Sequence, residues 1–240
     1  MTSNNAVKRI AKDIKSIIDD PIDNVYYQHD ETNLLKGYLL ILGNEMTPYS
    51  YGYCFFTIDF PDDYPFMPPI VTYLSNDGYT RYNPNLYICG KVCLSIINTW
   101  QGEGWTSCQT LRSIIVVLTS IFNDKPLLNE PGIRDHSKMI DKYNLLIEYK
   151  TITFLINEIV KRINSTNDNT FNNKFHMFKD IVNKTFIDNY RKIISNLEDL
   201  HNRCKENNIE KLQIDTYNIN VTIDFSLIYK DLEKLYNSLS

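Results

Sequence analysis

The sequence predicts an α+β fold in which a single antiparallel sheet packs against helices. Four runs rich in aromatic and β-branched residues follow one another between residues 25 and 74, joined by short links with turn-forming residues. Apolar residues at helical spacing precede and follow this block. Consecutive strands with short links pair as an antiparallel meander, because parallel strands would need a long crossover connection between them.

The first helix is predicted by apolar residues that repeat with a period of 3.6. Asp19-Asp20-Pro21 ends it. The repeat consists of Val7, Ile10, Ala11, Ile14, Ile17 and Ile18. The outer face of this helix is basic, with Lys8, Arg9, Lys12 and Lys15. It is either a solvated surface or a docking surface for an acidic partner.

The expected strands cover Val25 to Gln28, Leu34 to Leu42, Tyr51 to Phe60 and Ile70 to Leu74. Tyr64-Pro65, an aromatic-proline pair in the turn before the last strand, is predicted to have a cis peptide bond. A trans bond there would make this prediction wrong.

Helices are expected to dominate the rest of the chain. Thr110 caps a helix through Phe122, and a long helix runs from about Ser137 to Ile163. The polar stretch from Ser165 to Thr170 is the best linker. Beyond it we expect a helix carrying Phe175 to Leu200, a short strand or extended connection within Leu212 to Phe225, and a last helix from Ser226 to Leu239. The predicted division is therefore a domain of residues 1–163 and a helical extension of residues 164–240 packed on it.

Composition limits the class of partner and the compartment. A net charge of −4 gives no attraction to nucleic acid or to an anionic membrane, and no apolar run is long enough for a membrane span. The N-terminus lacks the apolar region of a secretion signal. Five cysteines, an odd number without a framework pattern, favour a reducing compartment. We expect a location in the cytosol or nucleus.

The most informative stretch leads from a turn to a cysteine. Pro84 fixes its own backbone angle and biases Asn83 away from helix, so Asn85 is held in place, eight residues before Cys93. A thiol beside a carboxamide suits acyl transfer through a thioester, in which the carboxamide N–H stabilises an oxyanion. We expect the sulfur of Cys93 to be exposed at the end of this rigid turn.

The Asn83-to-Cys93 stretch resembles the active-site motif of ubiquitin-conjugating enzymes, in which His-Pro-Asn precedes the catalytic cysteine at this spacing. Phe60 to Pro69 is similar to the Tyr-Pro-x-x-Pro-Pro element of the same family. Three further blocks most resemble the apollon-like subfamily of hybrid conjugating-enzyme/ligase proteins: residues 90–95, 98–105 and 129–132. The resemblance implies a ubiquitin-conjugating fold. It also implies that Cys93 accepts ubiquitin from an activating enzyme and passes it to a lysine amine, without a cofactor.

The resemblance also suggests where partners bind. Family members offer the first helix to the activating enzyme, which implicates Lys8, Arg9 and Lys12. Phe66, Ser107 and Cys108 fall where the family presents two loops to ubiquitin ligases. An exposed Phe66 would suit an interface anchor, whereas packing in the core beside the prolines is the alternative. Ser107-Cys108 departs from the common Pro-Ala, which weakens the case for a generic RING ligase as partner.

Other departures concern catalysis. Many relatives place an acid just before Pro-Leu, but Lys125 stands there, so Asp124 is the candidate to position the amine and Glu130 a second one. Asn83 replaces the usual histidine and can cap the turn through its side chain. Ser95 stands where aspartate is frequent, which would alter access of the lysine.

Other functions must be weighed against this one. A cysteine protease needs a histidine base, and none of His29, His136, His176 and His201 lies in the motif. A thiol that receives a preformed thioester needs no such base, because an ordinary thiol is already a few per cent thiolate at neutral pH. Cys89, Cys93 and Cys108 lack the spacing of a structural zinc site.

Two further hypotheses about the function of this fold stay open. One is a catalytically idle scaffold that keeps the fold. The other is a hybrid that modifies substrates without a separate ligase; truncation after Ile163 would then leave charging intact but impair transfer.

Overall fold

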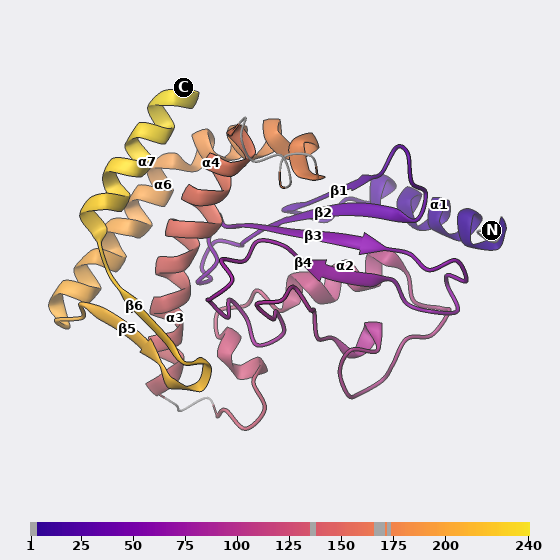
Figure 1. Cartoon of the computed structure of the whole chain (residues 1–240), viewed down its shortest axis with the longest axis horizontal. Helices are drawn as coiled ribbons and strands as arrows, with labels where there is room; N and C mark the ends of the chain where they lie inside the picture. Colours follow the sequence, from indigo (N-terminus) through magenta and orange to yellow (C-terminus); the bar gives the residue numbers. More distant parts are fainter. Residues whose placement is uncertain (1–3, 135–137, 166–170, 172–173) are drawn as a thin grey trace.

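The computed structural model describes residues 4–134, 138–165, 171 and 174–240. Helix α1 (Asn4–Asp19) leads into a sheet with strand order β1-β2-β3-β4 (Figure 1). Every neighbouring pair of strands is antiparallel. The strands are β1 (Val25–His29), β2 (Lys36–Leu42), β3 (Tyr53–Asp59) and β4 (Ile70–Tyr73). The predicted α+β class and the meander are confirmed, and so is the cis bond between Tyr64 and Pro65.

The helices that follow the sheet begin near the predicted residues. Thr110 caps α2 (Leu111–Ser120): its side chain accepts from the Ser113 N–H, and the Ser113 side chain accepts from the Thr110 N–H. The predicted long helix consists of α3 (Lys138–Lys150), a π-helical stretch (Thr151–Glu158) and α4 (Ile159–Asn164). Ser137, where it was predicted to begin, lies outside the described residues, as does most of the predicted linker.

In the C-terminal part, the described residues from 179 onward form a long helix, a hairpin and a last helix. These are α6 (Lys179–Glu206), β5 (Lys211–Ile214), β6 (Ile219–Thr222) and α7 (Phe225–Leu239). Strands β5 and β6 pair antiparallel, so the stretch predicted as one strand or an extended connection is a hairpin. In Figure 1 this hairpin lies alongside α3, and α6 and α7 gather at the end of the molecule opposite the N-terminus.

The two faces of the central sheet are both covered. In antiparallel pairing, Leu40 faces Phe55 and Leu39 faces Phe56, and these two pairs point to opposite sides. Phe56 packs toward α2, with its ring centroid 6.4 Å from that of Phe122. On the other side, Phe55 packs against Phe175 of the C-terminal part, with the two ring centroids 4.5 Å apart. An antiparallel sheet commonly leaves one face to solvent; here later residues of the same chain close it.

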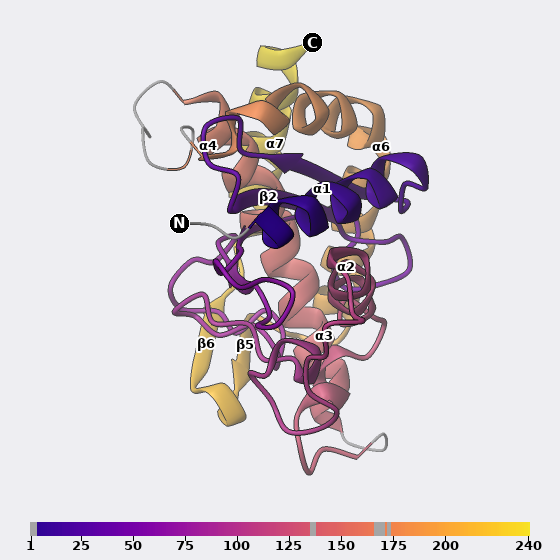
Figure 2. The ribbon, with the colours of Figure 1, turned by 90° about the vertical axis from the view of Figure 1, so that its right-hand side faces the viewer.

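The C-terminal part is also hydrogen-bonded to the sheet. The Tyr53 hydroxyl donates to the Val182 carbonyl at 3.1 Å and lies 3.1 Å from the Thr185 hydroxyl. Both residues are on α6. The view in Figure 2, from the side of α1, shows α7 and the C-terminus at the top of the molecule and the β5–β6 hairpin in its lower part. Among the described residues, no helix is both long and apolar enough to cross a membrane.

Candidate functional site

The turn before Cys93 is held by the side chain of Asn83. Its Oδ1 accepts from the Asn85 N–H at 2.9 Å, and its Nδ2 donates to the Ile121 carbonyl at 2.7 Å and to the Tyr49 hydroxyl at 3.0 Å. Asn83 is fully buried, so these bonds are shielded from water. The expectation that Asn83 caps the turn through its side chain is confirmed.

Asn85 and Cys93 are joined by two hydrogen bonds. The Cys93 N–H donates to the Asn85 carbonyl at 2.8 Å, and Asn85 Nδ2 donates to the Cys93 carbonyl at 2.7 Å. In the uncharged chain, the carboxamide of Asn85 therefore holds the backbone at Cys93 in place. Its Oδ1 is buried and has no hydrogen-bond partner among the described residues.

The expectation that the Cys93 sulfur is exposed is wrong for this structure. Cys93 is 3% exposed, and its neighbours Val92 and Leu94 are also buried. The Cys93 N–H and carbonyl are both bonded to Asn85, and the Leu94 N–H donates to the Thr99 hydroxyl at 2.9 Å. The chain on both sides of the thiol is thus fixed to its surroundings, so the thiol is reached only if part of its cover moves.

A tight turn precedes the cysteine and anchors it to the sheet. The Tyr87 N–H donates to the Lys91 carbonyl, and the Tyr73 N–H at the end of β4 donates to the Gly90 carbonyl at 2.8 Å. Gly90 has a φ of +90°, and a Cβ there would lie 2.9 Å from the Tyr73 carbonyl oxygen. This position therefore needs glycine. Residues 83–93 are called the Cys93 segment below.

The other cysteines differ in their surroundings. Cys89 and Cys108 are exposed, and Cys54 and Cys204 are buried. Burial raises the pKa of the Cys54 thiol above its ordinary value, which keeps it protonated. In the part of the chain that the structure describes, no three His, Cys, Asp or Glu side chains gather as ligands for a metal ion.

The two candidate carboxylates lie in different places. Asp124 lines a cavity of about 260 Å³ together with Asn144, Glu148 and Arg203, and neither Cys93 nor Asn85 lines it. The Glu130 carboxylate instead accepts from the Tyr217 hydroxyl at 2.6 Å. Glu130 belongs to the loop that approaches the Cys93 segment, since Asn129 Nδ2 lies 3.5 Å from Asn83 Oδ1.

Three residues predicted to meet ligases form an exposed edge. Phe66 is 72% exposed, so its alternative as a core residue is wrong. Ser107 and Cys108 are exposed on the loop that precedes α2, called the second loop below. Phe66, Ser107 and Cys108 are called the docking edge below. Lys8 and Lys12 are exposed on α1.

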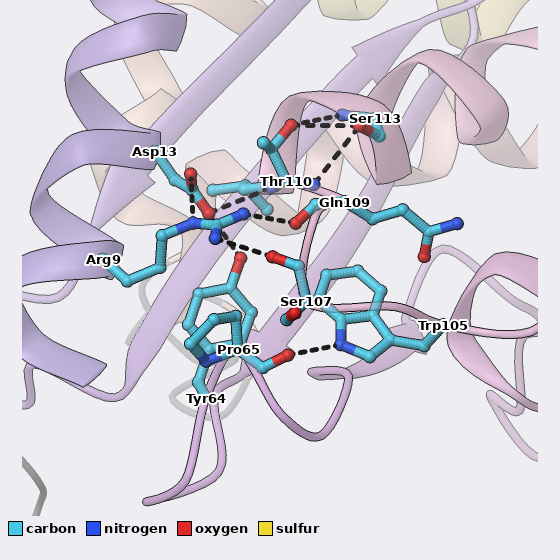
Figure 3. Close-up of polar contacts among 10 residues, drawn as sticks. Arg9, Asp13, Tyr64, Pro65, Trp105, Ser107, Gln109, Thr110 and Ser113 are labelled. Atoms are coloured by element: carbon cyan, nitrogen blue, oxygen red, sulfur yellow. Dashed lines mark hydrogen bonds and ion pairs between the residues drawn. The ribbon is translucent and has the colours of Figure 1, made fainter. Parts of the chain in front are cut away.

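Arg9 differs from the two lysines, because its guanidinium is used inside the molecule (Figure 3). Its Nε donates to Asp13 at 3.0 Å, its Nη1 donates to the Ser107 carbonyl at 2.8 Å, and its Nη2 donates to the Gln109 carbonyl. The structure thus gives Arg9 the role of fastening the second loop to α1.

Asp13 is the buried centre of this network. It is 2% exposed, and it also accepts from the Tyr64 hydroxyl and from the Leu111 N–H. Trp105 Nε1 donates to the Pro65 carbonyl at 2.7 Å, which ties the two loops together (Figure 3). Sequence reasoning missed Asp13. Its place on the apolar face of the first helix, between Ile10 and Ile17, was the available signal.

Comparisons with known proteins agree with the motifs. A family model described as ubiquitin-conjugating enzyme matches residues 9–152. The chain is 31% identical over 230 residues to a protein of Xenopus tropicalis named ubiquitin-conjugating enzyme E2 Z, covering 85% of this chain and 74% of the relative. It is 34% identical over 163 residues to the human protein of that name, covering 67% of this chain and 46% of the relative.

Among solved structures, the chain resembles a ubiquitin-conjugating enzyme E2 from Plasmodium falciparum. The TM-score is 0.43 at 25% identity, and the match covers 48% of this chain and 96% of that structure.

Proposed function

Because the chain belongs to the ubiquitin-conjugating enzyme family, we propose that Cys93 accepts ubiquitin as a thioester and passes it to a lysine amine. In the first step, the Cys93 thiolate attacks the thioester carbonyl presented by an activating enzyme. The new S–C bond forms as the activating enzyme's thiolate leaves. In the second step, a lysine amine attacks the same carbonyl, loses a proton, and displaces the Cys93 thiolate.

The observation that carries this proposal is the double hydrogen bond between Asn85 and Cys93, at the family's spacing and inside the region that the family model matches. Asn85 holds the loop in the resting state. Its Nδ2 has a second hydrogen, which we assign to the oxyanion that forms during transfer. A cysteine protease is disfavoured by the surroundings of two histidines. His29 bonds to Tyr27, and His201 stacks on Phe225 at 4.4 Å.

The second step needs help because a lysine amine with a pKa of about 10.4 is mostly protonated at neutral pH. A nearby carboxylate can orient the amine and accept its proton. Asp124 and Glu130 remain the candidates for this role, and Glu130 belongs to the loop nearer Asn83. We assign lysine as the acceptor class; desolvation of the amine beside Cys93 would lower the cost of its deprotonation.

Partners follow from the exposed surfaces. Lys8 and Lys12 on α1 would meet an acidic surface of the activating enzyme, with Arg9 holding the loop beside them. Phe66, Ser107 and Cys108 would meet a ligase or a substrate protein, with Phe66 as the apolar anchor. The five free thiols fit a reducing compartment such as the cytosol or nucleus.

A catalytically idle scaffold is the second candidate, and the burial of Cys93 together with three sequence departures favours it. Cys93 is only 3% exposed, and Asn83, Ser95 and Lys125 depart from the family pattern. A scaffold would bind ubiquitin or an activating enzyme through the same surfaces but would carry no acyl group. The two candidates therefore differ in one measurable property, a covalent adduct.

A charging assay separates them. The full chain is incubated with ubiquitin, activating enzyme and ATP, and the products are compared with and without thiol reductant. We expect a reductant-sensitive adduct for the natural chain. Cys93→Ser should give an ester that survives reductant, because oxygen replaces sulfur, and Cys93→Ala should give no adduct.

Cys89→Ala and Cys108→Ala are the matched controls, because both thiols are exposed and neither is assigned a role in charging. Both variants should charge like the natural chain. Equal charging of Cys93→Ala and the natural chain would refute the proposal. Binding of the activating enzyme without any adduct would favour the scaffold.

A further inference from the structure

The C-terminal hairpin lies against the residues that lead into the Cys93 segment. The Tyr79 hydroxyl accepts from the Asn220 N–H at 2.7 Å and lies 3.3 Å from the Asn220 carbonyl. The pair joins β6 to the chain shortly before Asn83. Residues some 140 positions apart in sequence are therefore in contact, at the hairpin seen beside α3 in Figure 1.

Arg81 is the residue that holds the turn from outside. Its Nε donates to the Asn83 carbonyl at 3.2 Å, and its Nη2 donates to the Pro84 carbonyl at 2.6 Å. Its guanidinium carbon lies 3.3 Å from the centre of the Tyr87 ring, within the Cys93 segment. One side chain thus joins three positions of the segment, combining charged hydrogen bonds with a cation–π contact.

Tyr217, in the turn of the hairpin, covers Arg81. The centre of its ring is 5.6 Å from the Arg81 guanidinium carbon and 5.9 Å from the centre of the Tyr143 ring. The Tyr143 hydroxyl donates to the Arg81 carbonyl at 2.6 Å, so backbone and side chain of Arg81 are both held. Removing the Tyr217 ring would leave one side of the guanidinium open to water.

The Tyr217 hydroxyl makes a second, separate connection, to Glu130 at 2.6 Å. Burial, and then the hydrogen bond to Glu130 and its negative charge, raise the pKa of Tyr217, so the hydroxyl stays a donor. One side chain of the extension therefore touches two loops: residues 81–93, which carry the thiol, and the loop that carries Glu130.

We propose that Tyr217 is a positioning residue for acyl transfer: its ring fixes Arg81 on the turn before Cys93, and its hydroxyl fixes Glu130. This inference rests on the proposed function and assigns the C-terminal hairpin a part in it. A residue that merely filled space would need neither the hydroxyl contact to Glu130 nor a ring placed over the guanidinium. The same contacts would make the lysine-transfer step depend on a region outside the family match, which ends at residue 152.

The test compares three variants of the full chain, Tyr217→Ala, Tyr217→Phe and Tyr236→Ala. The Tyr236 ring stacks on Tyr190 at 4.0 Å within the extension, so its loss removes a comparable aromatic contact that does not involve residues 81–93. Each variant is charged, the activating enzyme is quenched, and discharge of the adduct to free lysine is followed over a range of lysine concentrations. Thermal unfolding of each variant is measured in parallel.

We expect Tyr217→Ala to lower the maximal discharge rate about tenfold, because small displacements of reacting groups are costly. Tyr217→Phe keeps the ring over Arg81 and loses only the hydroxyl bond to Glu130. Its maximal discharge rate should therefore lie between those of Tyr217→Ala and the natural chain, nearer to the natural rate. Tyr236→Ala should discharge at the natural rate whatever its loss of thermal stability. A natural discharge rate for Tyr217→Ala would overturn the proposal. So would an equal loss in Tyr217→Ala and Tyr236→Ala at equal thermal stability.

A second readout does not depend on charging. Amide hydrogen exchange of residues 82–93 in the uncharged chain should be faster in Tyr217→Ala than in the natural chain and unchanged in Tyr236→Ala. Unchanged exchange in Tyr217→Ala would overturn the positioning role. If the natural chain itself does not charge, the proposed function fails, and the exchange measurement still decides whether Tyr217 holds the segment.

Discussion

The docking edge and the Cys93 segment are built in opposite ways. At the docking edge the backbone is fixed while side chains are free: Arg9 and Trp105 hold the carbonyls of Ser107 and Pro65, and Phe66 is 72% exposed. In the Cys93 segment the side chains of Asn83 and Asn85 are hydrogen-bonded as well as the backbone, and Cys93 is 3% exposed. The difference suggests that a surface for partners needs a rigid frame with open side chains. Under the proposed function, the thiol that would react is instead covered in the uncharged chain.

The largest effect is expected from breaking the frame beneath the docking edge. Arg9→Ala leaves the buried Asp13 carboxylate without its charged partner, which should lower the free energy of unfolding by about 3 kcal/mol. Urea unfolding measures this. Lys12→Ala, on the exposed face of the same helix, should change it by less than about 0.5 kcal/mol. Equal losses for the two variants would show that the network beneath the edge adds no stability.

A smaller effect is expected from the turn in the Cys93 segment. Gly90→Ala places a Cβ 2.9 Å from the Tyr73 carbonyl oxygen at a φ of +90°, which should cost about 2 kcal/mol. Gly78→Ala is the matched control. It has a φ of +71° but no atom within 4 Å of the new Cβ, so only the backbone term of about 1 kcal/mol applies.

Thermal or urea unfolding of both glycine variants separates the cost of the close contact with Tyr73 from the backbone cost of a positive φ. If they are equally stable, the close approach of Gly90 to β4 does not pin the segment. The Cys93 segment would then be less firmly fixed, relative to the docking edge, than its contacts indicate.

The smallest effect on stability, and a clear one on binding, is expected from Phe66→Ala. Since this side chain is exposed, the free energy of unfolding should change by less than about 0.5 kcal/mol. Affinity for a ligase domain that docks on the edge should fall about tenfold or more, as for an apolar anchor. Titration calorimetry measures the affinity. Met46→Ala, at a residue 93% exposed elsewhere on the surface, is the control. Unchanged affinity for Phe66→Ala would remove Phe66 from the interface.

Local pattern was enough to predict most of the fold. Residues 25–74 alternate between strand-forming runs and turns, and Thr110 with Ser113 marks the start of α2, so short-range preferences determine these elements. The hairpin of β5 and β6 was missed because four-residue strands with a 3₁₀ turn carry little periodic signal. The division at residue 163 stays a prediction.

The site was predictable in its residue types but not in its environment. The spacing of Asn85 and Cys93 indicated the segment, yet spacing says nothing about how far a thiol is covered. The contacts of Tyr217 with Arg81 and Glu130 join residues more than 80 positions apart. Such contacts depend on how the chain folds back on itself, which a local reading of one sequence does not contain.

The covered sheet face also changes how the extension should be tested. Truncation after Ile163 was expected to spare charging. It would remove Phe175 and α6, and so uncover Phe55 and Tyr53 on the sheet. Exposing that apolar face would also destabilise the part of the chain that the family model matches. Point substitutions in the full chain are therefore the sound way to test the extension.

The most direct measurement is to locate the acyl group on the chain. After charging, free thiols are alkylated in urea with one reagent. A small thiol then takes ubiquitin by thioester exchange and is removed, and the protein thiol set free is labelled with a second reagent. Mass spectrometry of the peptides then identifies the cysteine that carried ubiquitin. The account predicts the second label on Cys93. A second label on Cys89 or Cys108, or no second label on any cysteine, would contradict it.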